Sequence, residues 1–89
     1  MNDEHLRSFI SVINYGSFNK AAEAKYISPQ ALLKQINALE RDTGLQLLIR
    51  TPRGVTPTPA GREFYKGAQL ALALTQDVLS RCKETEQRN

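Results

Sequence analysis

The stretch that decides the fold is SPQALLKQINALERDTG, residues 28–44. Its apolar residues Leu32, Ile36 and Leu39 recur at helical spacing, and at about 100° per residue they lie within roughly 60° of each other around a helix axis. Gly44 stands where such a helix would stop. We therefore expect a helix that packs one narrow apolar stripe against a core.

The opposite side of this helix is polar. Gln30, Lys34, Asn37 and Arg41 fall within a similar arc, and all four side chains can donate hydrogen bonds to base edges or phosphate oxygens. The pattern predicts a helix that packs with one face and contacts nucleic acid with the other. It fits equally well an ordinary amphipathic helix of a small bundle, whose outer face is only solvated.

The start of the helix is also encoded in the sequence. Ser28 can cap the first turn through its hydroxyl group, and Pro29 occupies the first helical position, where a missing N–H removes no hydrogen bond. Residues 19–27 are typical of a short helix and a tight connection. The two helices together predict a helix-turn-helix motif.

Residues 3–15, which precede this motif, place apolar residues at i, i+3, i+4 and i+7, the spacing of an amphipathic helix. This first helix should end near Gly16. Ser17 or Asn19 can cap the second, shorter helix, and we expect Phe18 to insert into the core.

After the motif, residues 45–57 contain two short extended segments around a turn with proline and glycine, and they predict a small β-hairpin. A hairpin directly after a reading helix is a wing. Its tip would present Arg50 and Arg53 next to Gly54, and guanidinium groups suit phosphates or a narrow minor groove. Arg50 has an alternative role, since a local carboxylate can hold it.

A capping hydroxyl and a proline occur again at Thr58 and Pro59, where they predict the start of a last helix that runs to about Glu84. Such a helix is about 40 Å long, so the preceding residues cannot cover all of it. One apolar stripe comprises Tyr65, Ala68, Leu72, Thr75, Leu79 and Cys82, and a second comprises Leu70, Leu74 and Val78. Two stripes imply two packing partners, the body of the same chain and a second copy. We assign the first stripe to the interface of a two-fold homodimer.

Composition limits the class of protein. The 89 residues make one domain, too small for a large internal pocket. Lys and Arg outnumber Asp and Glu by 12 to 9, and residues 43–62 hold three arginines and no acid, which favours an anionic partner. The single cysteine excludes an intramolecular disulfide. We find neither an export signal nor an apolar run that would span a bilayer, so we expect a cytoplasmic protein without a membrane partner.

Residue types that carry catalysis or bind metals do not cluster in the sequence. His5 has no second histidine or cysteine near it, so we expect a surface histidine and no metal site. Cys82 fits a packing seam better than a redox switch. The serines have no nearby partners for nucleophilic catalysis. We expect neither an enzyme nor a bound cofactor.

An ordered set of short motifs runs along nearly the whole chain. It comprises Leu6-Arg7-Ser8-Phe9, Gly16-Ser17-Phe18, Ala21-Ala22-Glu23, Ile27-Ser28, Gln35-Ile36, Leu39-Glu40, Gly44, Arg50, Arg53-Gly54-Val55 and Thr58-Pro59-Ala60-Gly61. This set closely resembles the DNA-binding region of LysR-type bacterial transcriptional regulators. The resemblance implies a mainly α fold: a winged helix-turn-helix of three helices plus a small β-hairpin at residues 1–57, followed by a long linker helix and tail at residues 58–89.

The same resemblance implies double-stranded DNA as the partner, with the recognition helix in the major groove and the wing on the flanking backbone. It implies dimers formed by antiparallel linker helices, and the intact protein can form higher oligomers. Such regulators continue into a two-lobed domain that binds a small-molecule co-inducer, and no residue here corresponds to that domain. We therefore expect a fragment of a longer protein, with a naturally short protein as the alternative.

Predicted DNA contacts fall in two places. In the recognition helix they are Ser28, Pro29, Gln30, Leu33, Lys34, Asn37 and Arg41, and in the wing they are Arg50, Arg53 and Gly54. Leu33 stands where the family commonly has a small hydroxyl residue, so it can touch a thymine methyl group instead of hydrogen-bonding a base. Lys25 stands where the family usually has an apolar residue, which implies different packing of the second helix.

The predicted function is that of a sequence-specific DNA-binding domain of a bacterial transcriptional regulator, which binds an interrupted palindromic operator as a dimer. An alternative from another class is a protein-interaction module, in which the long helix is the functional surface and the winged body is a scaffold. That alternative predicts dimers without affinity for DNA. A third candidate is a regulator that responds to metal oxyanions and has a similar N-terminal domain.

Overall fold

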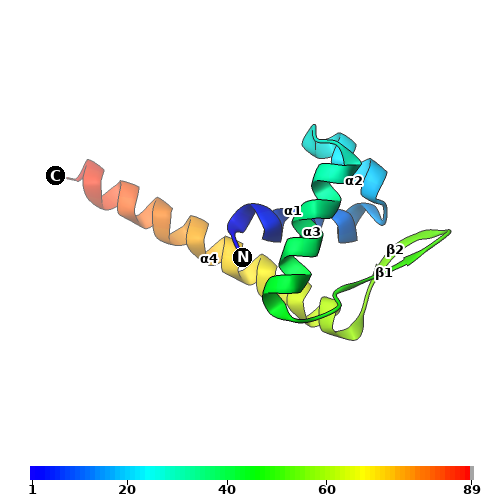
Figure 1. The fold of residues 1–89 in the computed structure, drawn as a ribbon. Helices are drawn as coiled ribbons and strands as arrows, with labels where there is room; N and C mark the ends of the chain where they lie inside the picture. Colours follow the sequence, from blue (N-terminus) through cyan, green and yellow to red (C-terminus); the bar gives the residue numbers. More distant parts are fainter. Residues whose placement is uncertain (89) are drawn as a thin grey trace.

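A computed structural model describes residues 1–88 and contains four helices and one β-hairpin (Figure 1). The elements in chain order are α1 (Asp3–Tyr15), α2 (Phe18–Lys25), α3 (Pro29–Thr43), β1 (Leu48–Thr51), β2 (Gly54–Pro57) and α4 (Pro59–Gln87). The mainly helical architecture, with a two-stranded wing after the third helix and a long last helix, confirms the predicted fold class. None of these helices is both long enough and apolar enough to cross a membrane.

Each helix begins at a side chain that caps its first turn. The Asn2, Ser17, Ser28 and Thr58 side chains each accept the backbone N–H three residues further along. The sequence left Ser17 and Asn19 as alternative caps of α2, and the structure selects Ser17. The caps predicted for α3 and α4 are confirmed.

The core lies where α1, α2 and α3 meet and is closed by the residues just before the wing and by the first turns of α4. Its most completely buried large side chains are Phe9, Val12, Leu32, Ile36, Leu39 and Leu47. Phe64 of α4 packs edge-to-face on Phe9, with the ring centroids 5.5 Å apart. The core therefore continues across the predicted boundary between residues 57 and 58.

A close approach of two backbones fixes the start of α4. The N–H of Thr58 donates to the carbonyl oxygen of Leu47 at 3.0 Å, and the Thr58 hydroxyl donates to the carbonyl oxygen of Gln46 at 2.7 Å. A Cβ atom on Gly61 would lie only 2.0 Å from the Leu47 oxygen. Only glycine allows α4 to start this close to the segment that leads into the wing.

The wing contacts the rest of the body through the start of β2, close to the turn of the hairpin. Its antiparallel strands pair Leu48 with Pro57 and Thr51 with Gly54. The N–H of Val55 donates to the carbonyl oxygen of Gly16, in the turn between α1 and α2, at 3.0 Å. Gly54 has a φ of 136°, and a Cβ atom there would lie 2.5 Å from the same Gly16 oxygen.

Lys25, which stands where an apolar residue was expected, forms an ion pair. Its side chain is only 17% exposed, and its ammonium group lies 3.0 Å from a carboxylate oxygen of Glu4. An ion pair between α2 and α1 thus occupies the place where an apolar contact was expected. The charged end is tolerated because the Glu4 side chain is 52% exposed and water reaches the pair.

The long helix α4 leaves the body and projects away from it, so the chain measures 55 × 27 × 19 Å (Figure 1). Ala68 is buried, and Tyr65 and Leu72 pack against the core. These three residues, which the sequence assigned to the dimer interface, therefore cover at least part of the body of their own chain. Thr75, Leu79 and Cys82 continue the same stripe beyond the body and are exposed.

Candidate nucleic-acid interface

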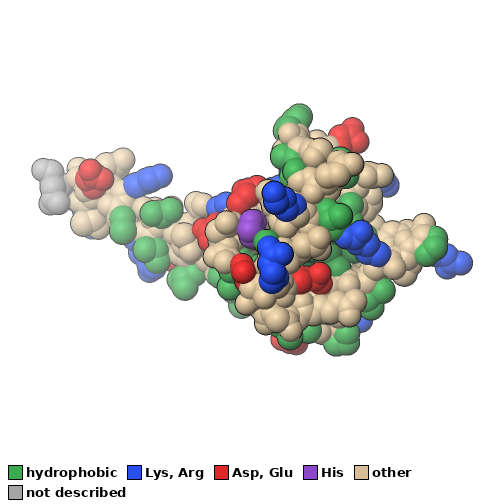
Figure 2. Space-filling view, in the orientation of Figure 1, with side chains coloured by type: hydrophobic (Ala, Val, Ile, Leu, Met, Phe, Trp, Pro, Cys, Tyr) green, Lys and Arg blue, Asp and Glu red, His purple; other side chains and the backbone are tan. Residues whose placement is uncertain are grey.

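The outer face of α3 is exposed to solvent. Gln30, Lys34, Asn37 and Arg41 are all exposed, while the opposite stripe of the helix is fully buried. Within residues 1–88 neither Lys34 nor Arg41 forms an ion pair, so both cations are available to a ligand. On the face seen in Figure 2, Lys and Arg side chains occur near the histidine and at the end of the hairpin, with Asp and Glu side chains among them.

The rotation of α3 about its own axis is set by its inner side. Ser8 of α1 is completely buried, and its hydroxyl group donates a hydrogen bond to the side-chain oxygen of Gln35. Ser28, directly before the first residue of α3, caps the helix, and its side-chain oxygen accepts the N–H of Ala31 at 3.1 Å. These contacts direct the polar side chains of α3 outward.

One flank of the exposed face is a cationic groove between α1 and α3. The groove, of about 350 Å³, is lined by His5, Ala31, Lys34, Gln35, Ala38 and Arg41. His5 differs from the expected surface histidine: it is half-buried, and within residues 1–88 its buried Nδ1 atom has no hydrogen-bond partner. No carboxylate lines this groove, which suits an anion such as a phosphate group.

Asp42, which follows the groove residue Arg41 in the chain, already has a cationic partner. The ammonium group of Met1 lies 2.7 Å from the carboxylate of Asp42, and this hydrogen bond lowers the pKa of the Asp42 carboxyl below its usual value. Arg41 and His5 act in the same direction through their charges. Asp42 therefore stays ionised but carries its own counter-charge.

The other flank is a cleft between the start of α2, the start of α3 and the wing. It has a volume of about 250 Å³ and is lined by Phe18, Asn19, Pro29, Gln30, Leu33 and Arg50. The guanidinium carbon of Arg50 lies 4.6 Å from the centroid of the Phe18 ring. Arg50 is thus held by an aromatic ring through a cation–π contact, and not by the local carboxylate that the sequence offered as an alternative.

At the tip of the wing, Arg53 is exposed on an ordered turn. Its N–H donates to the hydroxyl oxygen of Thr51 at 3.2 Å, and that hydroxyl group donates to the carbonyl oxygen of Gly54 at 3.2 Å. The predicted wing residues therefore separate, with Arg50 beside α3 and Arg53 at the far end. Gly54 shapes the wing, because its φ of 136° is rare for other residues and a side chain there would collide with the carbonyl oxygen of Gly16.

The structure assembles only part of the predicted site in one place. Gln30, Leu33 and Arg50 surround the cleft, whereas Lys34 and Arg41 line the opposite groove. Phe18 packs partly against the core, as expected, but it also lines the cleft, a role that sequence reasoning missed. The described residues contain no group of three or more His, Cys, Asp or Glu that could hold a metal ion.

Comparisons with known proteins agree with this geometry. The profile of bacterial regulatory helix-turn-helix proteins of the lysR family matches residues 4–62. The nitrogen assimilation regulatory protein nac of Escherichia coli (strain K12) is 44% identical over 72 residues, which make up 81% of this chain and only 24% of that protein.

Two solved structures superimpose over almost the whole chain. The BenM_DBD/benA site 1 DNA complex has 39% sequence identity and a TM-score of 0.91, and the match covers 96% of this chain and 99% of that chain. The CbnR_DBD–DNA complex has 33% identity and a TM-score of 0.93, with 96% and 98% covered. Both structures contain DNA.

Proposed function

Because the chain belongs to the lysR family of bacterial regulatory helix-turn-helix proteins, we propose that it is the sequence-specific DNA-binding part of a transcriptional regulator. The observation that carries the proposal is the two-sided character of α3. Its Leu32, Ile36 and Leu39 side is fully buried, while the side with Gln30 and Lys34 is exposed, and within residues 1–88 Lys34 forms no ion pair. The two DNA complexes of similar fold and at least 33% identity support the same role.

In this proposal, cations set the position of the protein on the duplex. Lys34 and Arg41 of the cationic groove, together with Arg50 and Arg53 of the wing, contact phosphate groups on the two sides of α3. Gln30 reads a base edge, since its amide can both donate to and accept from an adenine. Ser28, Pro29, Leu33, Asn37 and Gly54 complete the surface that approaches the duplex.

Binding to DNA is tested by titrating the purified chain with genomic DNA fragments at several salt concentrations. We expect log K to fall linearly with log salt, because phosphate contacts release counterions. The double variant Lys34→Ala/Arg53→Ala should reduce the slope by about two. Lys66→Ala is the matched control, since Lys66 is an exposed lysine on α4 whose ammonium group lies 3.8 Å from the carboxylate of Glu63. A flat plot for the wild-type chain would remove the proposal.

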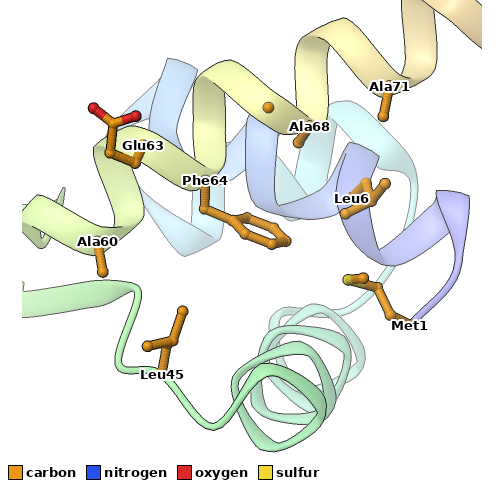
Figure 3. Close-up of a pocket in the computed structure, with 9 residues that line it drawn as sticks. Met1, Leu6, Leu45, Ala60, Glu63, Phe64, Ala68 and Ala71 are labelled. Carbon is orange, nitrogen blue, oxygen red and sulfur yellow. The ribbon is translucent and has the colours of Figure 1, made fainter.

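We further propose that two copies dimerise through α4. Leu70 and Leu74 are 71% and 61% exposed, which is unfavourable for a chain that stays monomeric. Beside them lies a cavity of about 460 Å³ whose lining is Met1, Leu6, Leu45, Ala60, Glu63, Phe64, Gly67, Ala68 and Ala71. In Figure 3 the side chains of Met1, Leu6, Leu45 and Phe64 point toward this space.

The cavity and the exposed leucines belong to one continuous face of α4. Gly67 and Ala71 line the cavity, and Leu74 and Val78 lie within about 60° of them around the helix axis. An antiparallel second α4 can place the apolar outer part of one copy over the cavity of the other. The interface proposed here therefore uses the second stripe of the sequence and the outer part of the first, Thr75, Leu79 and Cys82.

The dimer is tested by measuring molar mass in solution over a range of concentrations. Leu74→Glu should give a monomer, because it places a charge in the apolar face. Ser80→Glu is the matched control: Ser80 is exposed and lies on the side of α4 away from Leu74 and Val78, so this variant should stay dimeric. A wild-type chain that is monomeric at high concentration would overturn the proposal. Dimers without affinity for DNA would instead favour the protein-interaction module.

For the whole regulator, we propose a cytoplasmic protein that acts on interrupted palindromic operators and is controlled by a small-molecule co-inducer. Two α3 helices related by a dimer axis would meet half-sites about one helical turn apart, or a multiple of it. No co-inducer site is assigned to these 89 residues. DNase footprinting on enriched fragments tests the spacing, and two protected regions out of phase with the helical repeat would contradict it.

A further inference from the structure

The cleft between α2, α3 and the wing differs chemically from the rest of the proposed DNA-binding face. Phe18, Pro29 and Leu33 supply apolar surface to it, while polar groups come from the remaining lining residues, Asn19, Gln30 and Arg50. The neighbouring positions on α3 carry an ammonium group at Lys34 and an amide at Asn37, both exposed. The proposed reading surface thus contains one apolar hollow beside its polar residues.

The hollow remains open with every side chain in place. Arg50 is held over the Phe18 ring at 4.6 Å, so the guanidinium group does not fill the space. Pro29 and Leu33 are one helical turn apart, and Leu33 is half-buried, so part of its side chain still faces outward. The cleft has a volume of about 250 Å³, enough for a methyl group together with the edge of the base that carries it.

The chemistry of the major groove restricts what can enter this cleft. Phosphate groups favour cations, and the edges of guanine, adenine and cytosine present hydrogen-bond donors and acceptors, which lose hydration against an apolar surface. Thymine alone presents an apolar group in the major groove, its 5-methyl group. Burial of that methyl group is the contact that apolar carbon atoms at this site can favour.

We propose that the cleft of Phe18, Pro29 and Leu33 binds the 5-methyl group of one thymine in each half-site, with Leu33 as the residue that determines specificity. This inference rests on the proposed DNA-binding function and specifies one base of its target. Gln30, at the edge of the cleft, then contacts a base pair next to that thymine. Arg50 holds the adjacent phosphate and is positioned by Phe18.

The test begins with a duplex that the 89-residue chain selects from a random pool. Each thymine in that duplex is then replaced in turn by deoxyuridine, which removes only the methyl group. At one thymine per half-site the wild-type chain should bind roughly fourfold more weakly, the effect expected for one buried methyl group. At the other thymines the affinity should change little.

Variants assign the effect to the cleft. Leu33→Ala should bind the thymine and deoxyuridine duplexes equally, whereas Leu33→Met, which keeps an apolar side chain of similar volume, should keep the discrimination. Lys34→Ala is the matched control: it should weaken both duplexes by the same factor and leave their ratio near fourfold. Thermal unfolding of each variant checks that it is folded.

The outcomes separate this inference from the function on which it rests. Selective binding with no sensitivity to any thymine methyl group would overturn the inference and leave the DNA-binding proposal intact. A sensitivity that survives Leu33→Ala would also overturn it, because the methyl group would then be bound elsewhere. Failure to enrich any sequence would remove both proposals.

Discussion

The carboxylate of Glu40, on α3, accepts the backbone N–H of Leu47 at 2.6 Å, so the recognition helix itself holds the segment that leads into the wing. The N–H of Leu48 lies 3.3 Å from the same oxygen. Leu47 is fully buried, and a buried N–H without an acceptor is costly. One side chain of α3 therefore helps to set the distance between this helix and the hairpin.

Replacing Glu40 should loosen this connection. We expect Glu40→Ala to lower the free energy of unfolding by about 1–3 kcal/mol, because it leaves a buried N–H unsatisfied. Glu40→Gln keeps one acceptor oxygen and should lose less. Urea unfolding followed by circular dichroism measures both. An alanine variant as stable as the wild-type chain would show that water or another group replaces the carboxylate.

Two glycines of α4 should respond to alanine in opposite directions. At Gly61 a Cβ atom would lie 2.0 Å from a backbone oxygen, so Gly61→Ala should destabilise the fold by about 1–3 kcal/mol or more. At Gly67 a Cβ atom would meet nothing within 4 Å, and Gly67→Ala should stabilise the helix by up to about 1 kcal/mol. Thermal unfolding at low protein concentration compares them. The same sign for both would contradict the packing at Gly61.

The ion pair of Lys25 and Glu4 should contribute little to stability. Lys25→Leu restores the apolar residue type expected at this position, and it leaves Glu4 half-exposed to water. We expect a change within about 0.5 kcal/mol in the free energy of unfolding. Lys25→Asp would place two carboxylates together and serves as the unfavourable counterpart. A leucine variant that loses much more would mean that the pair organises α1 and α2.

The contact between Met1 and Asp42 predicts a pH dependence. The pKa of Asp42 is lower in the folded chain than its usual value of 3.8, so the contact stabilises the fold above that pH and is lost as pH falls through the folded pKa. Asp42→Asn should therefore lower the unfolding temperature slightly at neutral pH and have no effect in strong acid. Acetylation of the Met1 amine should give the same loss. Losses that add together in the doubly modified chain would contradict a direct pair.

The elements themselves could be predicted because local signals and long-range packing agree. Ser28 with Pro29, and Thr58 with Pro59, mark helix starts through hydroxyl groups that accept N–H bonds in the same turn. The apolar spacing of α3 then identifies its buried side. Signals of this kind involve residues within a few positions of each other, so they can be read without the tertiary structure.

The assignment of the two stripes on α4 could not be predicted in the same way. Both stripes are apolar, and periodicity does not say which one faces the body. That choice is made by contacts distant in sequence, the close approach of Gly61 to Leu47 and the packing of Phe64 on Phe9. The contact of Arg50 with Phe18 joins residues 32 positions apart, so it could not be predicted from the sequence either.

The contact of Gly54 with the Gly16 carbonyl has a consequence for the geometry of any operator. A hairpin that is fastened at the start of β2, near its own turn, to the turn between α1 and α2 cannot swing relative to α3 without breaking the Val55 hydrogen bond. In each protomer, the distance between α3 and the wing would accordingly stay fixed when the protomer binds its half-site. Operators with a different spacing between half-sites would then be accommodated by a change in how the two protomers are arranged, and not by a change within either protomer.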